Sequence, residues 1–215
     1  MVLSFFFLAA AAVTLAGHGV LGAGSGGGNL EVKENAAEAA MAVFTNQLRT
    51  APCGIGFGDL ADLVAAAQRN TSACDCLVLQ ITQYLEGTPF YGSTVTLLSE
   101  DEGVAVCSPY VYRSGGGDGL KSLEATNSLM DASYGINEQQ WLRVPVDTKK
   151  AVWSDPYFDE GGGNIEMETY SVPIVDGDSV LAVATTDLPI SSAKSSAMPL
   201  VSLGFVSSIV VALLP

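Results

Sequence analysis

Two strand patterns joined by a tight turn near the end of the chain constrain the fold more than any other feature. The segment NIEMETYSVPIV is followed by Asp176, Gly177 and Asp178, and then by SVLAVATTDLPI. Both flanking segments have the β-branched and aromatic content of strands, and the Asp-Gly-Asp sequence is typical of a hairpin turn. Strands joined by so short a turn are antiparallel neighbours. The sequence therefore predicts an antiparallel sheet.

Before this hairpin, the spacing of apolar residues changes from helical to strand-like. They recur every three or four positions from Leu30 to Leu48, then in DLADLVAAAQRN, with Asp59 as the expected N-cap, and in CLVLQITQYLEG. Three more strands are expected in STVTLLS, GVAVCSPYVYRSG and AVWSDPYF, and a short helix or irregular connection in NEQQWLRVPVDTKKAV. These elements predict an α+β domain, with a five-stranded antiparallel sheet and a long N-terminal helical segment.

The N-terminal segment has the shape of a secretory signal peptide. An apolar core from Phe5 to Leu15 is followed by small residues, and this core is shorter than the roughly 20 residues that a membrane span needs. We expect residues 1–23 to be the signal peptide, 24–29 a flexible leader and 30–190 the folded domain. Retention of the segment as a membrane anchor is the alternative.

The C-terminal segment, residues 191–215, is a hydrophobic tail without charge after Lys194. Small residues at Ser191, Ser192 and Ala193, a short polar spacer and an apolar end are the pattern of a glycosylphosphatidylinositol (GPI) attachment signal. A transmembrane segment is the alternative, because the apolar stretch is near the lower length limit. Both interpretations attach the chain to the membrane through this tail, with the domain on the extracellular face of the cell membrane.

The cysteines agree with passage through the secretory pathway. Their even number, at Cys53, Cys74, Cys76 and Cys107, favours disulfides. Cys74 and Cys76 are too close to bridge each other comfortably, so we expect Cys53 to join one of them and Cys107 the other. A zinc site at Cys-Asp-Cys lacks histidine partners and a second cysteine pair, so no metal is expected. Asn70 in Asn-Thr-Ser is an expected glycosylation site, which would make the chain a glycoprotein.

Charge and composition exclude several classes of function. The net charge of −14, from 23 acids and 9 bases, disfavours nucleic acid as a partner. The only histidine, His18, lies in the expected signal peptide, so a mature domain would have no imidazole base for a nucleophilic serine or cysteine. Asp155, Asp159 and Glu160 leave a carboxylate-pair mechanism as an alternative, but acids beside glycines are more often turn residues. We therefore expect no enzyme and no cofactor.

The segment from Trp153 to Ile190 resembles the signature of Cache domains, the extracellular PAS-like sensor modules of receptors. WSDPYFD has a tryptophan, then Pro-Tyr, then an acid; TYSVP follows, and VLAVATTD ends in an aspartate. The upstream FYGSTVTLL, SPYVYRSGGG and QQWLRVP resemble the membrane-distal module of double Cache domains of type 1. The resemblance implies a PAS-like sheet with a long N-terminal helix packed on it, and a small-molecule pocket between the sheet and the loops that cover it.

The resemblance also implies which residues line that pocket. It points to Trp141 in the covering segment, Tyr157 and Asp159 in the PYFD segment, and Asp187 on the final strand. A carboxylate on an inner strand must be paired or face a polar pocket. Arg113 is a plausible partner for Asp187, and Tyr170 is a further aromatic candidate for the lining.

The identity of the ligand depends on a departure from the family pattern. In amino-acid-binding members an arginine lies two residues before the tryptophan and grips the ligand carboxylate, and a tyrosine follows the tryptophan. This chain has Gln139 and Leu142 at those positions. Glutamine cannot replace a bidentate carboxylate clamp, whereas carboxylates and aromatic faces suit an ammonium group. We expect an amine-bearing ligand.

Together these features predict a non-catalytic, membrane-tethered extracellular domain that binds a small molecule. Signal transduction would pass through a membrane signalling partner. A ligand-free scaffold or adhesion module is the first alternative. The second is the truncated ectodomain of a signalling receptor.

Overall fold

The computed structural model describes residues 28–54, 56–114, 119–123, 128–160 and 163–190. The expected signal peptide and the hydrophobic tail, with Ser191, Ser192 and Ala193, lie outside these ranges. Across the ranges described, no helix combines the length and the apolar character needed to cross a bilayer.

The first part of the domain is helical, as the apolar spacing predicts. Helix α1 spans Gly28–Thr50, α2 spans Leu60–Arg69, the 3-10 helix η1 spans Thr71–Cys74 and α3 spans Asp75–Glu86. The Asp59 side chain caps α2 by accepting a hydrogen bond from the Asp62 N–H at 3.0 Å. Gly87 ends α3. The predicted caps and helices are therefore confirmed.

The second part forms one antiparallel sheet. Its strands are β1 Gly92–Leu98, β2 Ala105–Cys107, β3 Tyr110–Arg113, β4 Leu120–Ser122, β5 Val152–Trp153, β6 Tyr157–Phe158, β7 Glu166–Asp176 and β8 Ser179–Pro189. The sheet order is β4-β3-β1-β8-β7-β5, with β2 paired to β1 and β6 paired to β7. The 3-10 helix η3, Ile136–Glu138, and helix α4, Gln140–Thr148, lie between β4 and β5.

The predicted fold class is confirmed, but two of the five expected strands are interrupted. The strand expected in GVAVCSPYVYRSG divides into β2 and β3 around Pro109, and the one expected in AVWSDPYF divides into β5 and β6 around Pro156. Proline has no N–H to donate to a neighbouring strand, so it is poorly accommodated within a paired segment. The hairpin of β7 and β8 forms as predicted, and Asp176 pairs with Ser179 at its turn.

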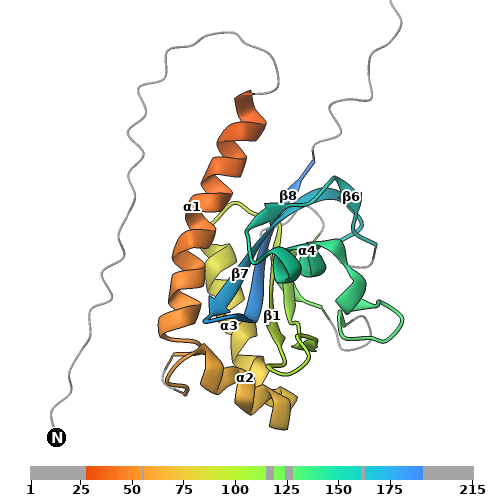
Figure 1. Ribbon diagram of the computed structural model, residues 1–215. Coiled ribbons are helices and arrows are strands. Elements are labelled where there is room, and N and C mark those ends of the chain that lie inside the picture. The colour runs from red at the N-terminus through yellow and green to blue at the C-terminus, as the bar shows by residue number, and fades with distance from the viewer. Residues whose placement is uncertain (1–27, 55, 115–118, 124–127, 161–162, 191–215) are drawn as a thin grey trace, which may run out of the picture.

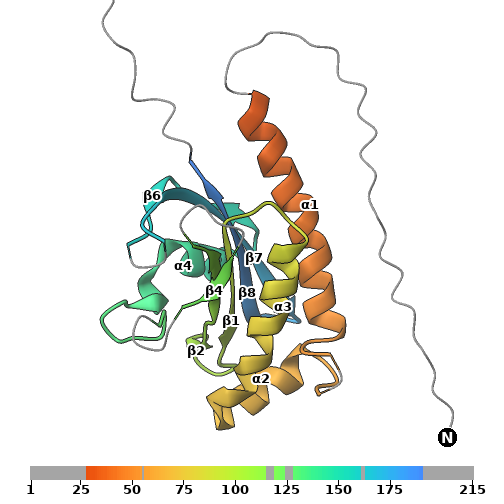
Figure 2. The ribbon, with the colours of Figure 1, turned by 180° about the vertical axis from the view of Figure 1, so that it is seen from behind.

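The sheet lies between two layers of helix. Helices α1 and α3 cover one face, and α4 with the segment before it covers the other (Figures 1 and 2). The larger apolar core, which includes Met41, Leu63, Leu77 and Ile81, fills the space on the side of α1 to α3. A smaller core with Leu98, Leu142 and Val183 lies beneath α4. The second layer is the one that covers the candidate site.

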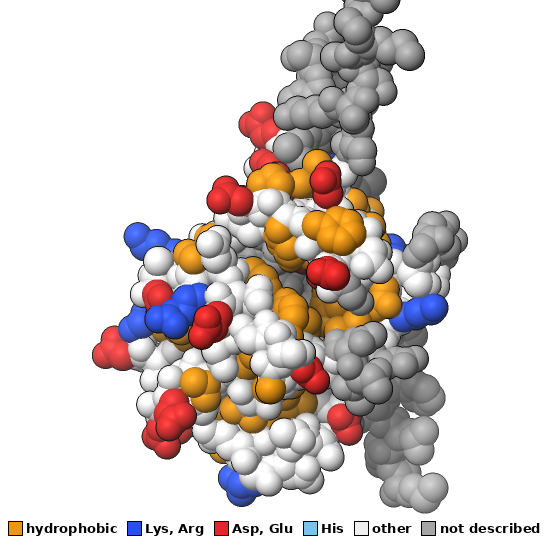
Figure 3. All heavy atoms as spheres, turned by 90° about the vertical axis from the view of Figure 1, so that its right-hand side faces the viewer, with side chains coloured by type: hydrophobic (Ala, Val, Ile, Leu, Met, Phe, Trp, Pro, Cys, Tyr) orange, Lys and Arg blue, Asp and Glu red, His pale blue; other side chains and the backbone are white. Residues whose placement is uncertain are grey.

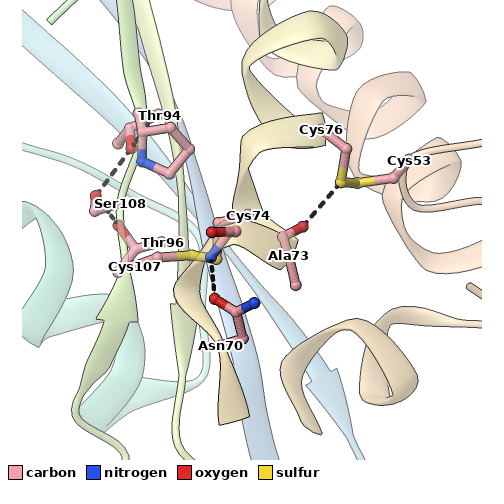
Figure 4. Close-up of a disulfide and its surroundings, with 11 residues drawn as sticks. Cys53, Asn70, Ala73, Cys74, Cys76, Thr94, Thr96, Cys107 and Ser108 are labelled. Carbon is pink, nitrogen blue, oxygen red and sulfur yellow. Dashed lines mark hydrogen bonds between the residues drawn. A yellow bond between two sulfur atoms is a disulfide. The ribbon is translucent and has the colours of Figure 1, made fainter. Parts of the chain in front are cut away.

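Two disulfides fasten the helical part to itself and to the sheet. Cys53 is bonded to Cys76, and Cys74 to Cys107, so Cys53 and Cys107 each join one of the two close cysteines as predicted (Figure 4). The first bond connects the segment after α1 to α3, and the second connects η1 to β2. Asn70 is exposed and caps η1 through a hydrogen bond from Ser72 N–H to its Oδ1 at 3.1 Å. Its glycosylation stays a prediction.

Candidate functional site

The site is centred on the carboxyl group of Asp187 in the middle of the sheet. Strand β8 lies between β1 and β7, and Asp187 pairs in register with Gly92 on one side and Thr169 on the other. Only 2% of Asp187 is exposed. Its side chain points toward the face beneath α4, as does that of Thr169, which donates a hydrogen bond to Asp187 Oδ1 at 2.8 Å.

The second oxygen of Asp187 is held by a tyrosine that occupies the space left by a glycine. Tyr110 O–H donates to Asp187 Oδ2 at 2.9 Å. A Cβ atom on Gly92 would lie 2.6 Å from Asp187 Oδ2 and would also overlap the Tyr110 hydroxyl. Gly92 is therefore required for this contact, because any larger residue would displace one of the two partners.

A chain of hydroxyl groups extends from Asp187 to β6. Tyr157 O–H lies 2.7 Å from Thr169 Oγ1. The threonine hydroxyl has a single hydrogen, which it donates to Asp187, so the Tyr157 hydroxyl is the donor in this contact. Tyr157, Thr169 and Asp187 thus form one directed hydrogen-bond chain.

Asp159 supplies a second carboxyl group to the same cavity. Its backbone is fixed in the hairpin after β6 by hydrogen bonds that connect Asp159 N–H to Ile165 O and Asn164 N–H to Asp159 O. Asp159 Oδ2 is buried and has no hydrogen-bond partner within the part of the chain that the structure describes. A buried oxygen without a partner is costly, and it marks a position where a donor would be stabilised.

Aromatic side chains from the covering segment also line the cavity. Trp141, at the start of α4, is 8% exposed, and its Nε1–H lies 3.4 Å from the hydroxyl of Tyr134. The complete lining is Thr94, Tyr110, Leu129, Tyr134, Trp141, Tyr157, Asp159, Met167, Thr169, Thr185 and Asp187. The cavity has a volume of about 20 Å³. This is room for about one water molecule or a group of similar size.

Burial shifts the ionisation of both carboxyl groups in the same direction. Removal from water raises the pKa of Asp187 to about 7; the hydrogen bonds from Thr169 and Tyr110 oppose this rise, and the charge of Asp159 adds to it. Burial raises the pKa of Asp159 to about 6. The pKa values of Tyr110, Tyr134 and Tyr157 are also raised, chiefly by burial, so these phenols stay neutral near pH 7.

The cavity therefore combines acidic and aromatic groups. Among the described residues that line it, none is lysine, arginine or histidine. On the face of the molecule shown in Figure 3, hydrophobic side chains occupy the middle, with acidic and basic side chains around them. Among the residues described, no group of three or more His, Cys, Asp or Glu side chains is placed to hold a metal ion.

Of the six ligand-binding candidates, the structure brings four together in this cavity: Trp141, Tyr157, Asp159 and Asp187. Arg113 is not among the lining residues, and it does not pair with Asp187. Its guanidinium donates to the backbone carbonyls of Leu85, Thr88 and Phe90 at 2.5, 2.8 and 2.9 Å. Carbonyls at the end of α3 and in the segment after it accept from Arg113, and the hydroxyls of Tyr110 and Thr169 take the place beside Asp187 that was expected for it.

Tyr170 is also outside the cavity. Side chains alternate between the two faces of a strand, and Thr169 occupies the cavity side of β7. Tyr170 therefore faces the helices, where its ring contacts that of Trp153 at a centroid distance of 4.8 Å. The prediction that Tyr170 lines the cavity was wrong for this reason.

Four important residues were not among the six predicted ligand-binding residues: Gly92, Tyr110, Tyr134 and Thr169. The period-two pattern of β7 was the one available signal for Thr169, because it shows which residues share a face. Tyr134 lies in an irregular segment, where no periodicity reports the direction of a side chain. Gly92 matters through the absence of a side chain, which only the positions of Tyr110 and Asp187 reveal.

Comparison with protein-family models gives one match. The model described as the first PDC sensor domain of methyl-accepting chemotaxis protein-like proteins matches residues 79–194, which include the cavity residues and most of α3. No curated protein matches the chain.

Solved structures with similar folds come from bacterial receptors. The sensory domain of the Campylobacter jejuni chemoreceptor Tlp3 with isoleucine bound has a TM-score of 0.50 and 11% identity, and covers 75% of this chain and 54% of that one. The L-valine complex of its ligand-binding domain gives the same values. The extracellular domain of soHK1S-Z6, assigned as a histidine kinase, has a TM-score of 0.44 and 25% identity. The match covers 75% of this chain and 61% of that one. The chain thus spans about half to three-fifths of these structures.

Proposed function

The chain belongs to the family of methyl-accepting chemotaxis protein-like sensor domains of the first PDC type, and from this membership we propose that it is an extracellular, non-catalytic domain whose ligand is a small amine. The membership confirms the resemblance to Cache-like sensor domains. The proposals about the ligand, the membrane tether and the signalling partner go beyond this family membership.

One observation carries the choice of an amine. Asp159 and Asp187 face a single cavity that contains no basic side chain, and Asp159 Oδ2 lacks a partner there among the described residues. An ammonium group would donate to that oxygen and pair with the negative charge. The faces of Trp141, Tyr134 and Tyr157 favour the same group through cation–π contact.

The covering segment supports an amine without an α-carboxylate. The Gln139 side chain donates to Tyr134 O at 3.0 Å, and Leu142 is 2% exposed within the smaller core. Neither residue offers a cation to a ligand carboxylate. The structures of the Campylobacter jejuni receptor hold isoleucine and valine, which carry that carboxylate. We therefore place the ligand of this chain in a different class from those two amino acids.

The size of the cavity bears on how the ligand enters. A volume of about 20 Å³ admits an ammonium or methylammonium head with the site as it is. A longer amine would displace Leu129, Tyr134 and Trp141 from the positions in which they line the cavity. Ligand binding would then change the packing of α4 against β7 and β8, which it contacts.

The extracellular, membrane-tethered location rests on three features. Two disulfides join the described cysteines, as is usual in an oxidising compartment. α1 begins and β8 ends at the same end of the domain, so attachment at either terminus would leave the opposite end free (Figure 1). The hydrophobic tail after Ile190, with a GPI-anchor signal at Ser191, Ser192 and Ala193, supplies the proposed attachment.

A thermal-shift screen of the full chain tests the proposal. Ammonium, methylammonium and putrescine are compared with acetate and isoleucine at pH 8, where both carboxyl groups are largely ionised. The amines are expected to raise the melting temperature, because a ligand that binds only the folded state stabilises it. Asp159→Asn is expected to abolish this rise, whereas Asp155→Asn, a change at an exposed acid of the same segment, is expected to retain it. A rise with carboxylates alone would refute the proposal.

A ligand-free scaffold is the second candidate, and the cavity volume favours it. Small-molecule pockets usually measure about 300–1,000 Å³, far more than the cavity seen here. The same screen separates the two candidates, because a scaffold would show no change in melting temperature with any of the compounds.

A further inference from the structure

The cavity places two acids together without a balancing charge. Asp187 is 2% exposed and Asp159 Oδ2 is fully buried. Two ionised carboxylates that line the same space would repel each other, and burial withdraws water from Asp187 and from Asp159 Oδ2. The fold therefore favours a state of the empty site in which the pair retains a proton.

No other group that faces the cavity can neutralise this pair. Its titratable groups are Tyr110 from β3, Tyr134 from the covering segment, Tyr157 and Asp159 from β6 and its turn, and Asp187 from β8. The elements β1, β7 and α4 contribute only uncharged side chains: Thr94, Met167, Thr169 and Trp141. The phenols are neutral acids, so among the described lining residues the two carboxyl groups are the ones that change charge in the physiological range.

We propose that Asp159 and Asp187 share a proton when the cavity is empty and release it when an amine binds, so that the site responds to external pH as well as to its ligand. The inference rests on the proposed function and defines how the same site is regulated. The exchange is balanced in charge: a cation enters, and the proton leaves from a carboxyl oxygen to the solvent.

The two carboxyl groups have different parts in this exchange. Both oxygens of Asp187 already accept hydrogen bonds, from Tyr110 and Thr169. Asp159 Oδ2 is the free acceptor, so the ammonium group would approach it first. The proton belongs to the pair, because each carboxyl group changes the affinity of the other for it. Occupancy by a cation stabilises the ionised form of both, and protons compete with the ligand at low pH.

Titration calorimetry of methylammonium into the full chain, in two buffers of different ionisation enthalpy, measures the protons released. Methylammonium keeps its charge at both pH 6 and pH 8.5, so any proton comes from the protein. We expect about one proton released per ligand at pH 6 and nearly none at pH 8.5. We expect the affinity to be about tenfold higher at pH 8.5, because less proton is displaced there.

Variants identify the source of the proton. Asp159→Asn removes the free acceptor, so it is expected to abolish the binding of methylammonium and, with it, the proton release at pH 6, while Asp155→Asn is expected to leave both unchanged. Tyr110→Phe removes a hydrogen bond to the ionised form of Asp187, so proton release should persist to higher pH. This last variant keeps the inference testable if a substitution of Asp187 prevents folding.

The outcomes separate this inference from the proposed function. Absence of methylammonium binding at both pH values would overturn both. Binding of equal affinity at pH 6 and 8.5 without proton release would overturn the inference and leave the amine proposal standing.

Discussion

Among the described carboxyl groups, Asp187 is the one whose ionisation the fold opposes most. Its carboxyl group lies on the central strand, and burial raises its pKa from 3.8 to about 7. Its two hydrogen bonds reduce this cost but do not remove it. A carboxyl group with a raised pKa in the folded state holds its proton longer there than in the unfolded chain. Its contribution to stability is therefore greatest at low pH.

The raised pKa of Asp187 gives a prediction for how the stability of Asp187→Asn depends on pH. Below about pH 4 both states of the wild-type protein hold the proton. Between about pH 4 and 7 only the folded state does, so the free energy of unfolding falls by on the order of 4 kcal/mol as pH rises. The variant lacks this titration, so its disadvantage relative to the wild type should shrink between pH 4 and 8. Urea unfolding at both pH values measures this difference, and an unchanged gap would contradict the account.

Gly92 provides a second test at the scale of single residues. Alanine there would force its Cβ against Asp187 Oδ2 and the Tyr110 hydroxyl. We expect Gly92→Ala to lower the free energy of unfolding by about 1–3 kcal/mol and to weaken amine binding, since both partners must move. Gly119→Ala is the control, because a Cβ at Gly119 meets no atom within 4 Å. Equal effects of the two substitutions would show that Gly92 has no special place in the site.

At the scale of elements, the sequence predicted the helices and the terminal hairpin well because both have clear periodicity. It could not predict how β7 and β8 align beyond their turn. Near the turn Asp176 pairs with Ser179 and Val175 with Val180, but Ile174 pairs with Ala182. Leu181 is the extra residue of this irregularity, which shifts the register by one. Counting from the turn would place Glu168 opposite Asp187, whereas the structure places Thr169 there.

The same limit explains the candidates that were wrong. Arg113 ends β3 close in sequence to the site, but its guanidinium is directed to carbonyls at the end of α3 and just after it. The sequence shows that an arginine will need hydrogen-bond acceptors. It does not show which acceptors the tertiary fold brings near the guanidinium. The four candidates that do meet came from a family resemblance, which carries three-dimensional information that periodicity lacks.

Substitution of Arg113 tests its reassigned role between elements. Arg113→Met removes the guanidinium that donates to Leu85 in the last turn of α3 and to Thr88 and Phe90 between α3 and β1. We expect a loss of about 1–3 kcal/mol in the free energy of unfolding and an unchanged affinity of the folded protein for methylammonium. Chemical denaturation and calorimetry measure the two quantities separately. A large loss of affinity without a loss of stability would return Arg113 to the site.

At the scale of the whole molecule, the site and the ends of the domain are connected by one strand. β8 carries Asp187 and ends at Pro189, beside the position where the described chain stops at Ile190. α1 begins at the same end of the domain (Figure 1). A ligand that moves Asp187 or the covering segment would thus act on the strand that leads toward the proposed membrane attachment. This arrangement suits a sensor whose output is carried by a partner.

The net charge of the whole chain favours the same class of ligand. At −14, the protein attracts cations from solution and repels anions, although salt screens this effect beyond about 8–10 Å. The general charge would aid the encounter with an amine. The selectivity must come from the two carboxyl groups and the aromatic faces of the cavity.

A crystal structure of the full chain with methylammonium tests the central claim most directly. The account predicts a bound ion whose nitrogen lies about 3 Å from Asp159 Oδ2, between the two carboxyl groups and against the ring of Trp141. A cavity that stays closed and filled by its own side chains at a methylammonium concentration that saturates binding, with the ion bound elsewhere, would contradict it.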